Sequence, residues 1–317
     1  MIRYLLRRAA SMLLVLIASS VVVFGFLHLA PGDPAKILLA GRPTTPQALE
    51  AIRQKYALDQ PLPVQYVTWA SRIIQGDLGE SIKERDTVIH VLTPRLGTTL
   101  ALTAYAALLM LVVGIPLGIA SAVYRSGPVD VLASTGALVV ASIPAYVSAV
   151  VLIAVFAVAL GWFPALGVGS GGIDMVYHLT LPAIALALSA LAIVSRVTRL
   201  SMIEALQTEY VETARIRGFS GRRVVLKHAF RSALIPVVTI SGVVVGYLLS
   251  GAILVEYAFG LNGVGALLVG SVQGLDYAVV QAIALLFTAE FLIINLGVDV
   301  LYAVIDPRLR LAGRSVR

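Results

Sequence analysis

The sequence contains no cysteine among its 317 residues, and only 13% of them are charged. Without thiols, the chain can form no disulfide, thiolate metal site or cysteine nucleophile. It also lacks the patterns H-E-x-x-H, G-x-S-x-G and G-x-x-x-x-G-K-[ST], which mark zinc proteases, serine hydrolases and phosphate-binding loops. These absences disfavour an intramembrane enzyme, and the chain is not expected to hydrolyse ATP itself.

Apolar residues are abundant instead: 59% of the chain is hydrophobic and its mean hydropathy is +0.92, well above a soluble domain. A membrane-spanning helix needs roughly 20 apolar residues. We predict an all-α membrane protein with six transmembrane helices, at Ala9–Ala30, Thr98–Val123, Val131–Leu160, Leu179–Val197, Leu234–Val255 and Val279–Val304. The first run is longer than a signal-peptide core, so we expect it to be retained. The third contains Pro144, which predicts a kink or a steep tilt.

Positive charge follows the predicted connections between spans. Eight of the Lys and Arg residues fall between Arg196 and Arg231, whereas Gly161–Tyr177 and Phe259–Tyr277 contain none. The positive-inside rule then predicts that both termini are cytoplasmic and that the protein is a multi-pass component of the cell membrane. Because the basic residues follow topology and not one soluble face, nucleic acid is not an expected partner.

Three parts of the chain are expected. Residues 1–30 form the N-terminal tail and first span, 31–97 form an extracytoplasmic insert, and 98–317 form the core with a basic hairpin at 204–233. Proline and glycine clusters at the borders of these parts are typical of turns.

Two short helices are predicted within the insert. The run Thr44-Thr45-Pro46 should cap a helix through Tyr56, with Pro46 at its first position, and Gly76 should end a second helix over Val64–Gln75. Apolar residues share one side of the second helix. That side either packs on the membrane domain or docks an external partner. Its residues are Tyr66, Trp69, Ile73 and Ile74.

The basic hairpin has the start and stop signals of a short helix. Thr208 offers a hydroxyl that can accept from an orphan N–H, and Gly218 stands where a left-handed residue is wanted. Acidic residues fall in the first turns and basic residues in the last, which complements the helix dipole. The four are Glu209, Glu212, Arg215 and Arg217.

A second hairpin helix is predicted from the cap Ser220 through about Ser232, with Pro236 beginning the fifth span at a kink. Helices this short are marginal in water alone. The hairpin therefore packs on its own span ends or on another protein; a plain basic loop that only satisfies topology is the alternative.

The run from Glu209 to Gly218, followed by Lys227-His228, Arg231 and Pro236, is similar to the EAA signature of ABC-transporter permease subunits. Over its full length the chain resembles the dipeptide/oligopeptide/nickel permease family. Further matches are Pro31-Gly-Asp-Pro34, Gly76-Asp-Leu-Gly79, Gly114-Ile-Pro-Leu-Gly118, Ser142-Ile-Pro144, Gly161-Trp-Phe-Pro164, His178-Leu-Thr-Leu-Pro182, Leu254-Val-Glu256, Gly263-Val-Gly265, Asp276-Tyr277 and Asp306-Pro-Arg308. The chain departs from the usual pattern at Ile216, Phe219 and Ser232.

The resemblance implies a type I ABC importer permease fold. The helix from Glu209 would seat in a groove of a cytoplasmic ATP-binding subunit, with Ala214 keeping the contact close and Gly218 ending the helix. Implied partners are a second homologous permease, two ABC ATPases, which would bind ATP and Mg, and an extracytoplasmic substrate-binding protein. No cofactor is implied for this chain. The implied ATPase-coupling residues are Glu209, Thr213, Ala214, Arg215, Arg217, Gly218, Lys227 and His228.

Several polar residues interrupt the predicted spans. Glu290 lies near the middle of the sixth, where a charge costs roughly 2.5–3.5 kcal/mol on insertion scales. It either lines the pathway, meeting a peptide's amino terminus, or makes a structural hydrogen bond. Asp299 is expected to pair with Arg196 or Arg199, and Glu256 to be solvated. The candidate pathway residues are Ser142, Tyr146, Glu290 and Asn295.

The sequence therefore predicts a permease subunit of an ATP-driven importer of di- or oligopeptides. Nickel or another small solute of the same family is an alternative cargo. A secondary transporter working alone, with Glu290 as a proton relay, is a second alternative. That class predicts inverted repeats and no coupling hairpin, whereas the sequence shows the reverse.

Overall fold

The computed structural model describes residues 2–29, 35, 39 and 45–305, and within them the chain is helical apart from turns and one isolated antiparallel bridge between Glu80 and Thr87. The motifs Pro31-Gly-Asp-Pro34 and Asp306-Pro-Arg308 lie outside the described residues. The α-helices are α1 (Ile2–Leu29), α3 (Pro46–Tyr56), α4 (Leu62–Ile74), α5 (Val88–Val123), α6 (Pro128–Ala141), α7 (Ala145–Leu152), α8 (Gly172–Leu206), α9 (Glu209–Ile216), α10 (Gly221–Arg223), α11 (Phe230–Ala258), α12 (Val264–Gln273) and α13 (Tyr277–Ile305). Two π-helical segments, η1 (Ile153–Ala159) and η2 (Val224–Ala229), extend α7 and precede α11.

Five helices of the described chain are long and apolar enough to cross a membrane, and a bent pair brings the count to six if it is one span. That pair joins Pro128–Ala141 to Ala145–Ala159 through a bend of 100°. The break falls at Pro144, whose extended backbone precedes α7. The predicted interruption of the third span is thus confirmed, and it is a sharp bend, because proline cannot donate to the helix ladder.

The chain divides into two compact units, Met1–Thr99 with Asn262–Leu292, and Leu100–Leu261 with Ile293–Arg317.

In the first unit, α4 packs on α1 through aromatic side chains. Phe24 has its ring centroid 5.6 Å from those of both Tyr66 and Trp69, and the hydroxyls of Ser20 and Tyr66 hydrogen-bond at 2.8 Å. These contacts support packing on a membrane helix as the role of this face. Ile74 was predicted on the same side but is 86% exposed, since it ends the helix.

The predicted cap of α3 is confirmed, because the Thr45 hydroxyl accepts from the Ala48 N–H at 3.2 Å. Farther along the unit, the Ser81 hydroxyl donates to a carboxylate oxygen of Asp276 at 2.6 Å. This buried bond fixes the loop before α5 to the start of α13.

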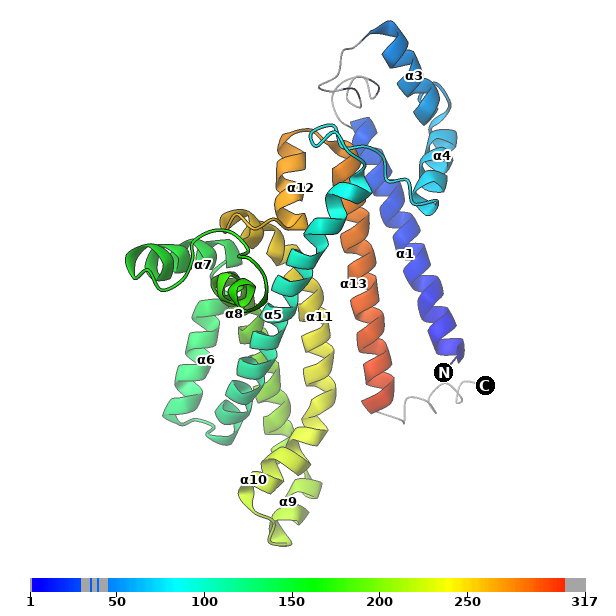
Figure 1. The fold of residues 1–317 in the computed structure, drawn as a ribbon. Helices are drawn as coiled ribbons and strands as arrows, with labels where there is room; N and C mark the ends of the chain where they lie inside the picture. Colours follow the sequence, from blue (N-terminus) through cyan, green and yellow to red (C-terminus); the bar gives the residue numbers. More distant parts are fainter. Residues whose placement is uncertain (1, 30–34, 36–38, 40–44, 306–317) are drawn as a thin grey trace. The chain divides into compact units, whose positions relative to one another are not determined.

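In the second unit, α8 is the central helix and packs against α6, α7 and α11 (Figure 1). Alanine and leucine side chains of α8 form most of its buried surface. Helix α5 also approaches α8, at Gly118, where a Cβ atom would lie 2.5 Å from the carbonyl oxygen of Ser195. Position 118, the end of the Gly114–Gly118 motif, therefore requires glycine, because the backbones of α5 and α8 approach too closely there for a Cβ atom.

Candidate functional site

The basic hairpin begins where α8 ends at Leu206, and its first turn is capped by backbone groups. The carbonyl of Thr208 accepts from the N–H groups of Val211 and Glu212 at 3.0 and 3.1 Å. Its hydroxyl, predicted to accept from the helix, instead donates to the carbonyl of Ala205 at 2.8 Å. The prediction of a hydroxyl cap is wrong here, because the side chain donates back to a carbonyl in the last turn of α8, which also accepts from the Thr208 N–H at 3.3 Å.

Gly218 ends α9 as predicted. Its φ is +79°, in the left-handed region, and its N–H donates to the carbonyl of Arg215 at 2.9 Å. The N–H of Phe219 donates to the carbonyl of Ala214 at 3.3 Å. These two bonds form a Schellman motif, which closes the helix without any partner outside the chain.

The second arm differs from the prediction. It does not end near Ser232 but continues from Gly221 through Ala258 as one apolar helix, with Pro236 inside α11. The Ser220 hydroxyl makes no capping bond; its backbone carbonyl accepts from the Val224 N–H at 2.9 Å.

A π-helical stretch explains this continuity. Val224 and Ala229 are buried five residues apart across η2, and Ala233 and Val237 follow at intervals of four within α11. Because a π-helix bonds residues five apart, η2 keeps the buried face in line with that of the following α-helix. The hairpin arm and the fifth span therefore share one continuous buried side.

The inner face of α9 packs into a small core. Val211 and Ala214 are 0% and 4% exposed and lie among alanine, valine and methionine side chains. The core residues are Ala122, Met202, Ala205, Val211, Ala214, Val224, Ala229 and Ala233. Ala214 was expected at the surface of the ATPase contact; it lies inside the hairpin instead, where its small side chain lets α9 pack closely on η2.

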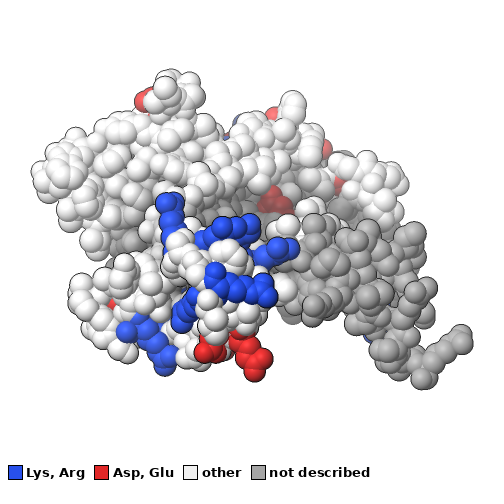
Figure 2. All heavy atoms as spheres, turned by 90° about the horizontal axis from the view of Figure 1, so that it is seen from below, with Lys and Arg blue, Asp and Glu red and all other residues white. Residues whose placement is uncertain are grey.

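The outer face of α9 is exposed. Ile216 is 80% exposed and Tyr210 is 57% exposed. Figure 2 shows Lys and Arg side chains gathered on the face seen from below, with acidic side chains beside them. The exposed charged residues of the hairpin between 209 and 231 are Glu209, Glu212, Arg215, Arg217, Arg222, Arg223, Lys227 and Arg231. The hairpin thus presents an exposed isoleucine beside charges of both signs.

His228 joins the two arms of the hairpin. Its Nδ1 atom lies 2.7 Å from the Tyr210 hydroxyl, and its ring stacks on Phe219 at a centroid distance of 5.2 Å. The guanidinium of Arg223 lies over the Phe219 ring, 4.7 Å from its centroid. Sequence reasoning placed His228 among the coupling residues but missed Tyr210 as its partner, since the two are 18 residues apart.

The candidate pathway residues occupy separate places. Ser142 and Tyr146 flank the bend between α6 and α7 and are exposed, with the Ser142 hydroxyl donating to the Leu138 carbonyl at 2.9 Å. Glu290 is half-buried on α13 in the first unit, and Asn295 is half-buried farther along the same helix. Their role in transport stays a prediction.

Two predictions about ionisable residues are wrong. Arg199 pairs with Asp130, with Nε and Nη2 at 2.6 and 2.8 Å from the two carboxylate oxygens, and not with Asp299. Asp130 begins α6 next to the α5–α6 turn and also accepts from the Ser121 hydroxyl, so it satisfies the guanidinium fork within the second unit. Glu256 is 0% exposed, not solvated, because the chain turns back beside it through the buried Phe259.

Apolar helices that can cross a bilayer, joined by a capped basic hairpin with an exposed outer face, define a multi-pass membrane protein. Residues 114–311 match the family described as binding-protein-dependent transport system inner membrane component, and residues 1–103 match its N-terminal component. The chain belongs to this family and is a non-catalytic permease subunit of an ABC transporter of the inner membrane.

Named relatives are similar over nearly the whole chain. The glutathione transport system permease protein GsiC of Salmonella paratyphi A is 42% identical over 310 residues, covering 98% of this chain and 99% of the relative. GsiC of Escherichia coli O6:H1 is 43% identical over 310 residues, which again cover 98% of this chain and 99% of the relative. Among solved structures, a chain of the methionine ABC transporter MetNI, in an inward-facing conformation, aligns with a TM-score of 0.59. It is 20% identical and covers 69% of this chain and 97% of its own, so it supports the type I importer permease fold alone.

Proposed function

We propose that this permease forms half of the translocation pathway of an ATP-driven importer and couples that pathway to ATPase subunits through α9. A second homologous permease would complete the pathway. Two cytoplasmic ATPases would bind ATP and Mg, and an extracytoplasmic binding protein would deliver the cargo. The family's description names a binding protein, which supports this composition.

The cargo we propose is a di- or oligopeptide. Relatives more than 40% identical are named as glutathione permeases, and glutathione is itself a tripeptide. This similarity supports a small peptide over nickel or another small solute, which stay as the second candidates within the same family.

The observation that carries the coupling role is the division of α9 into two faces. Val211 and Ala214 pack inward, whereas Ile216 points to solvent. An eight-residue helix is unstable in isolation, so this one is held rigid by its own hairpin core. A rigid helix with a free outer face can seat in a partner's groove and transmit the partner's movement to α8 and α11, which it joins.

We propose two kinds of role for the coupling residues. Glu209, Thr213, Arg215 and Arg217 are exposed and are proposed to contact the ATPase together with Ile216. The remaining residues would act within the hairpin. Ala214, Gly218 and His228 position the helix, and Lys227 adds exposed positive charge on η2.

The topology that accompanies this proposal follows the charge distribution. The termini and the basic hairpin would be cytoplasmic, and the 31–97 insert extracytoplasmic, since Lys and Arg concentrate in short cytoplasmic loops. Ser142, Tyr146, Glu290 and Asn295 are proposed to line the pathway.

The test is uptake by the assembled transporter in proteoliposomes, comparing Ile216→Asp with Ile74→Asp. The two isoleucines are matched, at 80% and 86% exposed, and differ in location. Removing a central contact costs enough to lower uptake on the order of tenfold or more in Ile216→Asp, with ATP hydrolysis retained. Ile74→Asp should transport normally.

Normal uptake by Ile216→Asp would remove α9 from the coupling role. Uptake by the permeases alone, without ATPases or nucleotide, would identify a stand-alone secondary transporter instead.

A further inference from the structure

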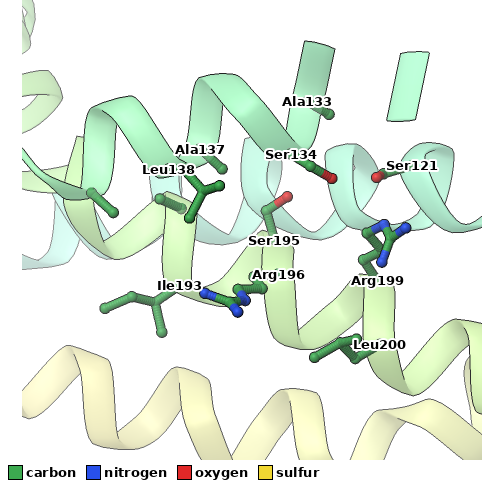
Figure 3. A pocket seen from close by; sticks show the side chains of 12 residues that line it. Ser121, Ala133, Ser134, Ala137, Leu138, Ile193, Ser195, Arg196, Arg199 and Leu200 are labelled. Atoms are coloured by element: carbon green, nitrogen blue, oxygen red, sulfur yellow. The ribbon is translucent and has the colours of Figure 1, made fainter. Parts of the chain in front are cut away.

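A cavity of about 380 Å³ lies between α6 and α8 in the second unit, next to the end of α5 (Figure 3). Its walls combine hydroxyl and guanidinium groups with small alanine side chains. The polar lining residues are Ser121, Ser134, Ser195, Arg196 and Arg199. None of these polar groups belongs to the hairpin described above, so the cavity is a separate feature of the molecule.

The two arginines of this cavity differ in their partners. Arg199 is held by the bidentate pair with Asp130. Arg196, one turn earlier on α8, makes no hydrogen bond or ion pair with any residue that the structure describes. Both lie on the 172–206 helix, which is long and apolar enough to span the membrane. Arg196 is exposed, so its guanidinium is accessible to a ligand that enters the cavity.

Ser195 is a second polar group without a partner. It is 4% exposed, and its hydroxyl makes no hydrogen bond to any other described residue. Other hydroxyls on the long apolar helices donate to the carbonyl four residues back. The Ser241 hydroxyl, for example, donates to the Val237 carbonyl at 2.7 Å. Figure 3 shows the Ser195 side chain directed from α8 toward α6, into the cavity. The Ser195 residue is almost wholly buried, and its hydroxyl faces the cavity, where a ligand or water can bond it.

We propose that this cavity is an oxyanion-binding site, in which the Arg196 guanidinium and the Ser195 hydroxyl bind a carboxylate or phosphate group. A guanidinium donates in a fork that matches either group. Asp130 does not repel the anion, because its charge is compensated by Arg199. The alanines on both helices leave room for the rest of the ligand. They are Ala133, Ala137, Ala141 and Ala192.

Two sources can supply this group. One is the terminal carboxylate of a peptide cargo, and this source rests on the proposed function. The other is the phosphate of an anionic phospholipid, because basic pockets between membrane helices bind such headgroups. Exposed Leu138, Ile193 and Leu200 border the cavity and are compatible with either a passing peptide or acyl chains.

The absence of cysteine makes a labelling test possible, since any thiol introduced in this chain is unique. Ile193→Cys places it at the cavity wall beside Arg196, and Val129→Cys places it on α6 outside the cavity. The two positions are matched, at 43% and 41% exposed. The measurement is the rate of maleimide labelling of this chain within the assembled transporter in nanodiscs.

One arm uses phosphatidylcholine nanodiscs and compares a tripeptide bearing a free carboxylate with its C-terminal amide. The other arm compares phosphatidylglycerol with phosphatidylcholine nanodiscs without peptide. At an oxyanion concentration about ten times its Kd, labelling at Ile193→Cys should slow about tenfold, because only the unoccupied site reacts, and labelling at Val129→Cys should stay unchanged. Adding Arg196→Gln should abolish the protection, Arg196→Lys should retain part of it, and Arg125→Gln should retain all of it.

Protection by the free acid but not the amide identifies the cargo as the source, and protection by phosphatidylglycerol identifies the lipid. Protection by neither, or protection that survives Arg196→Gln, overturns the site. ATP-driven uptake by the same purified transporter, reconstituted in proteoliposomes, separates this failure from a failure of the proposed function.

Discussion

The basic hairpin and the α6–α8 cavity each contain two nearby residues of a single helix that differ in their surroundings. The helix is α9 in the hairpin and α8 at the cavity. In the hairpin, Ala214 is buried and Ile216, two residues later, is 80% exposed. At the cavity, Arg199 is paired with Asp130, whereas Arg196 has no partner among the described residues. In each region one residue stabilises the fold. Its neighbour is an exposed apolar side chain in the hairpin and an arginine without an ion pair at the cavity. We infer that such neighbours mark the places where the permease meets a partner or a ligand.

The two regions are also stabilised by different kinds of interaction. The hairpin depends on backbone hydrogen bonds and on small buried side chains, so it should be sensitive to side-chain size and to backbone conformation. The cavity region depends on a carboxylate–guanidinium pair, so it should be sensitive to charge. Four substitutions, taken from the largest expected effect to the smallest, test this contrast.

Asp130→Ala should cause the largest loss of stability among these variants. It leaves the Arg199 guanidinium unpaired on a membrane helix and removes the acceptor of the Ser121 hydroxyl. The measurement is denaturant unfolding of the purified permease in detergent. Arg196→Gln is the control, because Arg196 makes no hydrogen bond or ion pair with any described residue. Equal losses from both variants would contradict the distinction between the two arginines.

Ala214→Leu should overpack the hairpin core and destabilise it by about 1–3 kcal/mol. The exposed neighbour Thr213→Leu should change stability by less than about 0.5 kcal/mol. Limited proteolysis of the hairpin, which reports local opening, is the suitable readout. If the two leucines have the same effect, then α9 does not pack with Ala214 inward.

Gly218→Ala should cost about 1 kcal/mol, because a Cβ is disfavoured at a left-handed φ. No atom lies within 4 Å of the added Cβ at either Gly218 or Gly221, so any difference between the two comes from the backbone. Gly221→Ala, which has no positive φ and starts α10, is the matched control and should be neutral or slightly stabilising. Similar unfolding of both variants would argue against the Schellman ending of α9.

Tyr210→Phe should have the smallest effect, about 0.5 kcal/mol, because it removes one hydrogen bond to His228 from an exposed side chain and keeps the ring. Hydrogen exchange of the α9 amides should increase while the rest of the permease is unchanged. Unaltered exchange would indicate that the Tyr210–His228 bond does not hold the two arms together.

Much of the fold could be predicted from the sequence, because its signals are local. Apolar runs of sufficient length indicated the spans, Pro144 indicated the break in the third, and Gly218 indicated the end of α9. Each of these depends on backbone chemistry within a few residues. The size of the 100° bend could not be predicted, since it depends on what α6 and α7 pack against.

The errors concern side chains whose partners lie elsewhere. The Thr208 hydroxyl bonds back to α8, which competes with capping. Arg199 pairs with Asp130, which is 69 residues away in the sequence, so no local sequence pattern predicts the pair. Ala214 was placed on the wrong face of its helix because one small residue fits equally well in a core or in a close contact with a partner. The π-helical register of η2, which merges the hairpin arm with α11, leaves no clear pattern in the sequence.

The central claim is that α9 turns Ile216 toward an ATPase and Ala214 toward its own hairpin. The most direct measurement attaches a benzophenone-maleimide to a single cysteine in the assembled transporter and detects cross-links to the ATPase. Ile216→Cys should cross-link efficiently, whereas Ala214→Cys should give little or no product. Cross-linking from Ala214→Cys but not from Ile216→Cys, or from neither position, would contradict the account.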